Sequence, residues 1–149
     1  MADQTGFLIS DVGRLLRRNF DVRARSIGVT RPQWKLLTTL ARNEGANQGR
    51  LADLIDVEPI SLCRMIDRLE ESGLVERRTD PADRRAWRIY LTEQAHPILS
   101  ELRTLADELL DQALDGLSAQ DRARLDESLQ RIRKNLEAFE DQGSEVANG

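Results

Sequence analysis

Four short segments in a fixed order constrain the fold of this chain more than any other feature. Residues 48–54 form a short segment with helical spacing of apolar side chains, and residues 58–73 form a longer one. The longer segment opens with a proline and closes with a glycine, as helices commonly do. Residues 74–79 and 87–91 then alternate between apolar and polar side chains, which predicts two strands. We therefore expect a short helix, a second helix and a β-hairpin, in that order.

The segment between the two predicted strands carries a strong turn signal. Residues 80–86 read Asp-Pro-Ala-Asp-Arg-Arg-Ala, and proline beside aspartate favours a turn. We expect this tip to project from the hairpin with Arg84 and Arg85, and we expect Asp83 to pair with one of the two guanidinium groups. A helix, a turn, a second helix and such a hairpin make up a winged helix-turn-helix, whose hairpin is the wing.

The second of the two helices has an outer face suited to the major groove of DNA. Its apolar residues Leu62, Ile66 and Leu69 share one side, so the opposite side is left to other side chains. A guanidinium group can bind a guanine edge, and an apolar side chain can contact a thymine methyl group. The candidate DNA contacts on this helix are Ile60, Ser61, Cys63, Arg64 and Arg68. Arg84 and Arg85 of the wing are candidates for the adjacent minor groove.

Basic residues are concentrated in the part of the chain that holds these segments. Residues 1–92 contain 16 Lys and Arg against 13 Asp and Glu, whereas residues 93–149 contain 6 against 13. The net charge of −4 argues against a broad basic surface that binds nucleic acid without sequence preference. We therefore expect any contact with DNA to be local.

Composition excludes several other classes of protein. A single cysteine and a single histidine exclude an internal disulfide and the usual His and Cys metal sites, and we expect no cofactor. No run of apolar residues is long enough to span a membrane and no secretory signal is visible, so we expect a cytoplasmic protein. No nucleophile motif or phosphate-binding loop is present, so we do not expect an enzyme. A small enzyme with paired carboxylates stays open as an alternative.

Long helices are predicted on both sides of the central segments. Residues 7–27 have the periodicity of an amphipathic helix, and Thr30 followed by Gln33 predicts a capping box for the next helix. Residues 93–116 carry an apolar stripe too broad for a helix with one buried side, and residues 125–139 repeat apolar side chains as a coiled-coil seam does. One small core cannot cover both surfaces, so we expect a homodimer, with an intramolecular helical hairpin as the alternative.

These patterns predict a mainly α fold with a small β-hairpin wing, in a single domain that spans residues 1–149. We expect the winged helix-turn-helix part at residues 30–92, and dimerisation helices at residues 1–28 and 93–141. The polar tail at residues 142–149 is expected to be disordered.

Several sequence blocks resemble one family of regulators. They are Gly28 to Trp34, Leu51 to Leu54, Asp67 to Glu70, Gly73 to Arg77, and the tip Asp80 to Arg85 that runs on to Leu91, Thr92 and Glu93. In this order, and over roughly residues 7–140, they resemble the multiple antibiotic resistance regulator (MarR) family. The resemblance implies a homodimeric winged-helix repressor on a pseudo-palindromic operator in double-stranded DNA. It also implies release of DNA by a small aromatic ligand or by an oxidant.

Two further predictions concern regulation. Trp34 and Phe20, with Arg14 and Arg18 of the first helix, are candidates to hold a small aromatic carboxylate, although Trp34 as part of the core is the simpler interpretation. Cys63 is the candidate for a redox-responsive regulator, because oxidation there would disturb groove contacts. A helical adaptor that does not bind DNA stays open as a third possibility.

Overall fold

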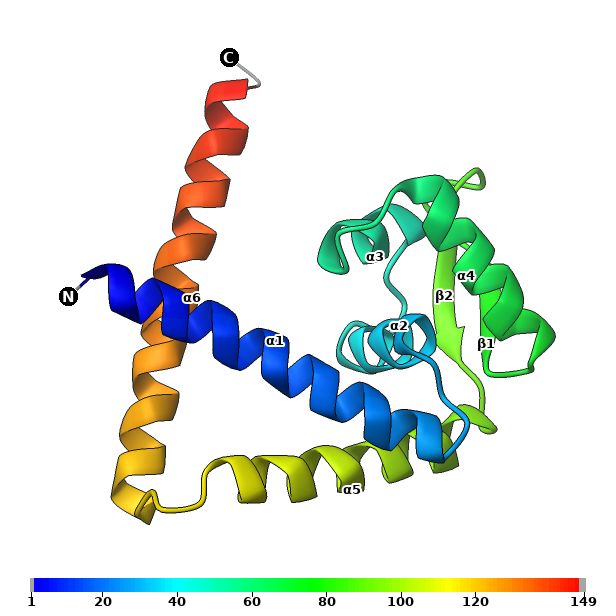
Figure 1. Ribbon diagram of the computed structural model, residues 1–149. Coiled ribbons are helices and arrows are strands. Elements are labelled where there is room, and N and C mark those ends of the chain that lie inside the picture. Colours follow the sequence, from blue (N-terminus) through cyan, green and yellow to red (C-terminus); the bar gives the residue numbers. More distant parts are fainter. Residues whose placement is uncertain (1, 148–149) are drawn as a thin grey trace. The chain divides into compact units, whose positions relative to one another are not determined.

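The computed structural model describes the backbone of residues 2–147 and the side chains of residues 4–143. Figure 1 shows its helices and its single hairpin. The elements are α1 (Ala2–Ser26), α2 (Arg31–Arg42), α3 (Gln48–Leu54), α4 (Pro59–Glu71), β1 (Val75–Thr79), β2 (Trp87–Leu91), α5 (Ala95–Ala113) and α6 (Ala119–Ala147). The strands are antiparallel, with Val75 opposite Leu91 and Thr79 opposite Trp87. The predicted mainly α fold with a small hairpin is confirmed.

The helix boundaries follow local signals in the sequence. Thr30 and Gln33 form the predicted capping box: the Gln33 amide donates to the Thr30 hydroxyl at 3.4 Å, and the Thr30 amide donates to Gln33 Oε1 at 2.9 Å. Pro59 occupies the first turn of α4, and Gly73 beyond its end has a φ of +75°. That left-handed conformation suits glycine, so the helix stops there and the chain turns into β1.

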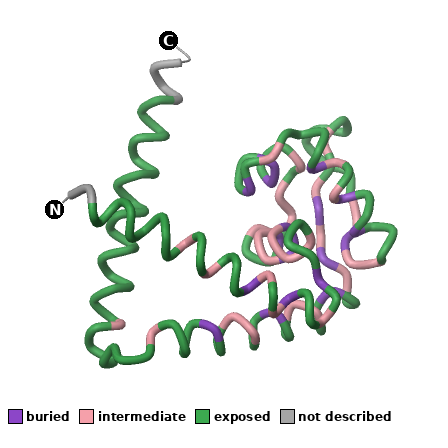
Figure 2. The backbone as a smooth tube through the Cα atoms, viewed as in Figure 1, coloured by how far each residue is buried: buried purple, intermediate pink, exposed green. Residues whose placement is uncertain are grey.

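The chain divides into two compact units, residues 1–109 and 110–149. The first unit contains a core made by the faces that α2, α3 and α4 turn toward the hairpin. Its fully buried side chains include Leu36, Leu37, Leu40, Leu51, Leu62, Ile66, Leu69, Val75 and Ile89. Figure 2 shows this buried set as the purple segments on α2, α3, α4 and the strands. The core fixes the orientation of α4, whose opposite side is left to solvent.

A second, smaller core joins α1 to α5 within the first unit. Phe20 and Ala24 of α1 pack in one cluster with Leu102 and Leu109 of α5. Val29, in the turn between α1 and α2, completes the buried set. The N-terminal half of α1 takes no part in this core, and apolar side chains there are exposed: Phe7, Leu8, Ile9, Val12 and Leu15.

The second unit, residues 110–149, differs from the first in the burial of its side chains. The Ser118 hydroxyl caps α6, since it accepts a hydrogen bond from the Asp121 amide at 3.1 Å. No side chain from Ala119 to Gly143 is buried. The seam residues are exposed: Leu125, Leu129, Ile132, Leu136 and Phe139.

Helix α6 extends to Ala147, and residues 148–149 lie outside the described part. Disorder of the polar tail at residues 142–149 stays a prediction. Among the described residues, no helix is both long and apolar enough to cross a membrane.

Candidate nucleic-acid interface

The turn between α3 and α4 sets the position of the candidate recognition helix. Asn47 caps α3, because its side-chain oxygen accepts a hydrogen bond from the Arg50 amide at 2.8 Å. After Leu54 the Val57 amide donates back to the Ala52 carbonyl at 3.0 Å, which closes the turn. The chain then enters α4 at Pro59. This turn is held by backbone hydrogen bonds, so the start of α4 has a defined place.

The outward side of α4 carries the predicted DNA contacts together. Ile60 is 66% exposed, and Ser61, Arg64 and Arg68 are exposed as well. Cys63 is half-buried, so it lies at the edge of this surface and not at its centre. A surface with an arginine, a hydroxyl and an apolar side chain has the donors and methyl contact that base edges in a major groove require.

Arg77 of β1 joins this helix to the rest of the winged part, and the sequence analysis did not select it. Its guanidinium group pairs with Asp67 at 2.6 Å and with Glu70 at 3.1 Å, both on α4. Its Nε donates to Gln48 Oε1 on α3 at 3.1 Å, and another nitrogen donates to the Cys63 carbonyl at 3.3 Å. One side chain therefore connects β1, α3 and α4.

The electrostatics of Arg77 follow from this arrangement. The side chain is only 14% exposed, and burial by itself would lower the pKa of its guanidinium group. The hydrogen bond and charge of Asp67, followed by the charge of Glu70, outweigh that effect and raise the pKa. The alternation of the strand could have indicated that Arg77 is partly buried. Arg77 lies on the same face of the hairpin as buried Val75, and its cross-strand partner is buried Ile89.

The tip of the hairpin exposes the two predicted wing arginines. Arg84 and Arg85 are both exposed. The expectation that Asp83 pairs with one of them is wrong: its carboxylate accepts a hydrogen bond from the backbone amide of Arg85 at 3.0 Å. A short aspartate side chain reaches the amide two residues ahead more easily than a guanidinium group that extends into solvent.

Asp80 holds the base of the same tip. It accepts a hydrogen bond from the Ala82 amide at 2.9 Å and pairs with Arg88 at 3.3 Å. The Ala82 amide, with a further contribution from Arg88, lowers the pKa of Asp80. The acidic groups of the tip are thus used within the tip, and its two arginines remain available to a partner.

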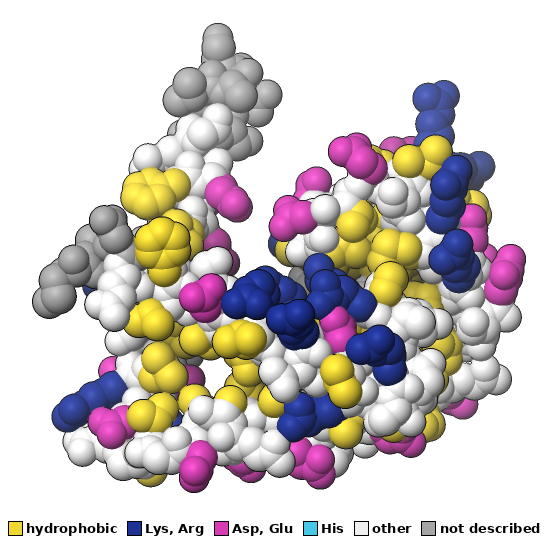
Figure 3. Space-filling model, in the orientation of Figure 1, with side chains coloured by type: hydrophobic (Ala, Val, Ile, Leu, Met, Phe, Trp, Pro, Cys, Tyr) yellow, Lys and Arg dark blue, Asp and Glu magenta, His cyan; other side chains and the backbone are white. Residues whose placement is uncertain are grey.

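Basic side chains are visible in two regions of the first unit. Figure 3 shows Lys and Arg gathered over α1 and α2, and others over α4 and the hairpin. The second region contains the candidate DNA contacts. Figure 3 also shows acidic side chains between the basic ones, so the positive surface is interrupted and not continuous.

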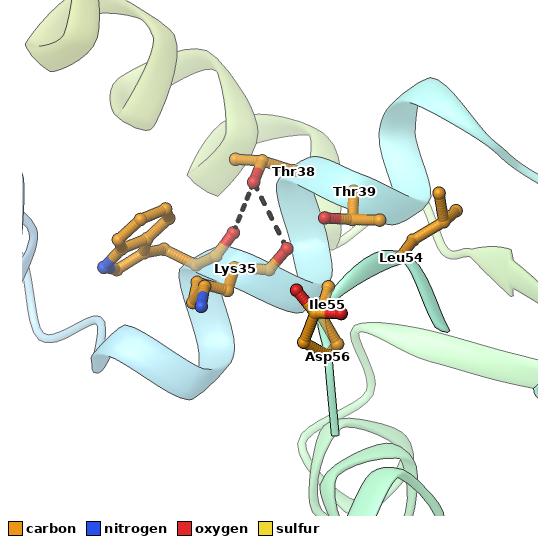
Figure 4. A pocket seen from close by; sticks show the side chains of 7 residues that line it. Lys35, Thr38, Thr39, Leu54, Ile55 and Asp56 are labelled. Atoms are coloured by element: carbon orange, nitrogen blue, oxygen red, sulfur yellow. Dashed lines mark hydrogen bonds between the residues drawn. The ribbon is translucent and has the colours of Figure 1, made fainter. Parts of the chain in front are cut away.

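The four residues predicted to hold a ligand are only partly brought together. Phe20 is buried and meets Trp34 edge to face, with ring centroids 4.8 Å apart. Arg14 and Arg18 are exposed on α1, and Arg14 pairs with Asp11 at 3.6 Å. Trp34 does line a cavity (Figure 4), but α2 and the end of α3 form it, without the other three residues.

Asp21 explains the orientation of Trp34. Its carboxylate accepts a hydrogen bond from Trp34 Nε1 at 2.7 Å and forms an ion pair with Arg31. Burial alone would raise the pKa of Asp21, but the hydrogen bonds from Arg31 and then Trp34 hold it below its usual value. Trp34 therefore serves the junction between α1 and α2, in agreement with its simpler interpretation as part of the core.

Comparison with known proteins places this geometry in a family. The model of the MarR family matches residues 29–87. A MarR transcriptional regulator from Methanosarcina mazei Go1 has a TM-score of 0.82 and 25% sequence identity, over 92% of this chain and 99% of that one. The transcriptional regulator PA3341 has a TM-score of 0.78 and 32% identity, over 90% and 98%. This chain belongs to the MarR family.

A third match carries a nucleic acid. It is a mutant MarR from E. coli complexed with operator DNA, with a TM-score of 0.70 and 26% identity over 85% of this chain and 91% of that one. The family resemblance and the winged-helix fold expected from the sequence are therefore confirmed. As a member of the MarR family, the chain is a transcriptional regulator.

Proposed function

We propose that this MarR-family regulator is a homodimeric repressor that binds a pseudo-palindromic operator in double-stranded DNA. The observation that carries the proposal is the exposed side of α4, with Arg64 at its centre, on the same small domain as the exposed arginines of the tip. A recognition helix in the major groove and a wing in the adjacent minor groove require this pairing of surfaces. A regulator that acts on the genome is expected in the cytoplasm of the cells that use it.

The proposed homodimer is supported by apolar side chains that the single chain leaves exposed. They lie on α1 and α6, where Phe7 is 72% exposed and Phe139 is 66% exposed. Large apolar surfaces on a small protein usually mark an interface. Two recognition helices related by a twofold axis would match two half-sites about one helical turn apart.

Operator binding with variants of the two surfaces tests the DNA proposal. Arg64→Ala is expected to cost about 1–3 kcal/mol of binding free energy and to relax preference at one base position. Arg84→Ala with Arg85→Ala is expected to weaken binding to all sequences and to reduce the salt dependence. DNA from the flanking intergenic region, titrated at several salt concentrations, provides the measurement.

Arg103→Ala on α5 is the matched control, because it removes an exposed arginine outside both surfaces. Normal binding by both the Arg64 variant and the wing variant would contradict this docking. Failure of the unmodified protein to bind any such DNA would favour the helical adaptor.

We also propose that a small aromatic carboxylate releases the operator. Support comes from Trp34 and Phe20 at the junction of α1 and α2, and from the exposed guanidinium groups of Arg14 and Arg18 on α1. A ligand that favours one spacing of the recognition helices needs only about 1–3 kcal/mol of coupling to lower affinity 5–150-fold.

Titration with salicylate-like and hydroxycinnamate-like acids, followed by tryptophan fluorescence and by operator binding, tests this regulation. Binding that survives Trp34→Ala combined with Arg14→Ala and Arg18→Ala would contradict the assignment. Release by peroxide alone would instead assign control to Cys63, whose sulfur lies 3.7 Å from the Arg77 guanidinium group.

A further inference from the structure

A pocket in the winged-helix part has no role in the proposed contact with DNA. Helix α2 forms one wall, and the end of α3 with the linker that follows it forms the other (Figure 4). Its volume is about 140 Å³, the space of roughly five water molecules at liquid density. The lining residues are Trp34, Lys35, Thr38, Thr39, Leu54, Ile55 and Asp56. The pocket therefore suits a small molecule and not a polymer.

Two opposite charges line this pocket without neutralising each other. Lys35 comes from α2 and Asp56 from the linker, and neither side chain forms an ion pair within the described residues. The Thr38 hydroxyl is already used, since it donates toward the carbonyls of Trp34 and Lys35 at 2.7 and 3.3 Å. The charged groups of Lys35 and Asp56 are thus available to an occupant of the pocket.

Asp56 occupies an unusual place in the backbone. Its φ of +54° is left-handed, which is uncommon for a residue other than glycine, and no other non-glycine residue in the described part has a positive φ. The turn around it is closed by backbone bonds, from the Asp56 amide to Asp53 at 3.3 Å and from the Val57 amide to Ala52 at 3.0 Å. The carboxylate is therefore not needed to hold the turn in place.

Apolar side chains lie beside the two charges. Ile55 is buried, and Leu54 is 41% exposed. An apolar molecule alone would desolvate both charged groups without pairing them, which is unfavourable. A simple carboxylate would meet the negative charge of Asp56, and a simple amine would meet the positive charge of Lys35.

We propose that this pocket binds a small zwitterion, an α-amino acid with a branched apolar side chain. Its carboxylate pairs with Lys35, its ammonium group pairs with Asp56, and its side chain packs on Leu54 and Ile55. Because the linker at Asp56 leads directly into α4, occupancy also biases the position of the recognition helix. This last consequence rests on the proposed function, whereas binding itself does not.

Binding of L-leucine to the full-length protein, measured by calorimetry, tests the proposal. Isocaproate has the same apolar chain without the ammonium group, and isoamylamine has it without the carboxylate. Each comparison removes one charge-assisted hydrogen-bonding group, so leucine is expected to bind about tenfold or more tightly than either. Equal affinity for the three molecules, or no saturable binding of leucine, would overturn the proposal.

Variants of the two charged residues locate the site. Lys35→Gln and Asp56→Asn are each expected to weaken leucine binding about tenfold, and Asp56→Asn is expected not to weaken isocaproate binding. Asparagine tolerates the left-handed conformation, so the turn is retained, and Asp56→Gly serves as a second variant that keeps it. Leucine binding that is unchanged in both charge variants would overturn the assignment.

Arg42→Gln is the matched control, because it removes an exposed positive charge from α2 outside the pocket. It is expected to leave leucine binding unchanged. Operator binding is measured separately without leucine, so a failure of the DNA proposal and a failure of this one give different results.

Discussion

The winged-helix core and helix α6 use apolar residues in opposite ways. In the first, Leu36, Leu40, Leu51 and Leu62 have no exposed surface, and three helices and a hairpin cover one another. In the second, apolar residues recur with helical spacing over 25 residues of described side chains, and none of them is buried. The two regions have similar apolar periodicity, yet only the first buries its apolar faces within the chain.

Apolar residues therefore have two different roles in the protein. Burial in the winged part fixes one side of α4 and leaves the other side exposed for the proposed contact with DNA. Exposure on α6 leaves a seam that a second copy is proposed to cover, since a homodimer interface resembles a core divided between two chains. The winged part should therefore depend on burial within the chain, and α6 should depend on burial between two chains.

The largest effect is expected from charges placed on the α6 seam. Leu129→Asp with Leu136→Asp should dissociate or unfold the proposed homodimer, because a buried unpaired charge costs several kcal/mol. Light scattering at micromolar concentration measures the change in mass. Gln130→Asp, at an exposed position beside the seam, is the control and should keep the dimer. A monomeric mass for the unmodified protein would contradict the proposed homodimer.

A smaller effect is expected from a cavity in the winged part. Leu62→Ala removes a fully buried side chain from α4 and should lower the free energy of unfolding by about 2–5 kcal/mol. Ile60→Ala, two residues earlier and 66% exposed, should change it by only about 0.5 kcal/mol. Denaturant unfolding followed by circular dichroism gives both values. Similar losses for the two variants would mean that the two sides of α4 do not differ as described.

Arg77 provides a sharper test within the winged part. Arg77→Ala should lower the free energy of unfolding by about 1–3 kcal/mol, because Asp67 and Glu70 lose a partly buried charged partner. Arg77→Lys should recover only part of the loss, since lysine lacks the planar fork of donors. Neighbouring Arg78→Lys, which changes a more exposed guanidinium group, is the control.

The salt dependence of operator binding separates positioning from direct contact for Arg77. If it only orients α4, Arg77→Ala lowers affinity while the slope of affinity against salt is unchanged. A reduced slope would instead identify Arg77 as a phosphate contact, as expected for the wing arginines.

The smallest effect concerns the junction of α1 with α2. The pKa of Asp21 is lower in the folded protein than its ordinary value of 3.8, so folding favours the carboxylate. The stabilisation is present above that ordinary value and is lost as pH falls through the lower folded pKa. Unfolding measured between about pH 6 and pH 2 should therefore show a loss that Asp21→Asn reduces. Identical pH profiles for both proteins would contradict the contribution of Asp21.

Sequence signals predicted most of the fold because they act over a few residues. The cap at Thr30, the proline at Pro59, the glycine at Gly73 and the cap at Ser118 each determine a boundary through neighbours on the chain. Alternation likewise predicted both strands, and helical periodicity predicted which side of α4 is buried. The candidate DNA contacts on α4 follow from this, because they lie on the opposite, exposed side. Cys63 is the exception, since it is half-buried at the edge of that exposed side.

One error arose because a short-range competitor was overlooked. Asp83 was expected to bind a guanidinium group, but its carboxylate accepts a hydrogen bond from the Arg85 backbone amide, a donor on the main chain that needs no long side chain to be ordered.

The sequence by itself determined the elements, their order and their apolar faces, since propensity, capping and periodicity are local properties of the chain. Tertiary structure alone decided the partners of Arg77, which come from residues 48, 67 and 70 and meet only when three elements pack. It also decided that Phe20 lies against Trp34, and that Lys35 and Asp56 line one pocket. Such contacts depend on how whole elements pack, and no periodicity within one element encodes them.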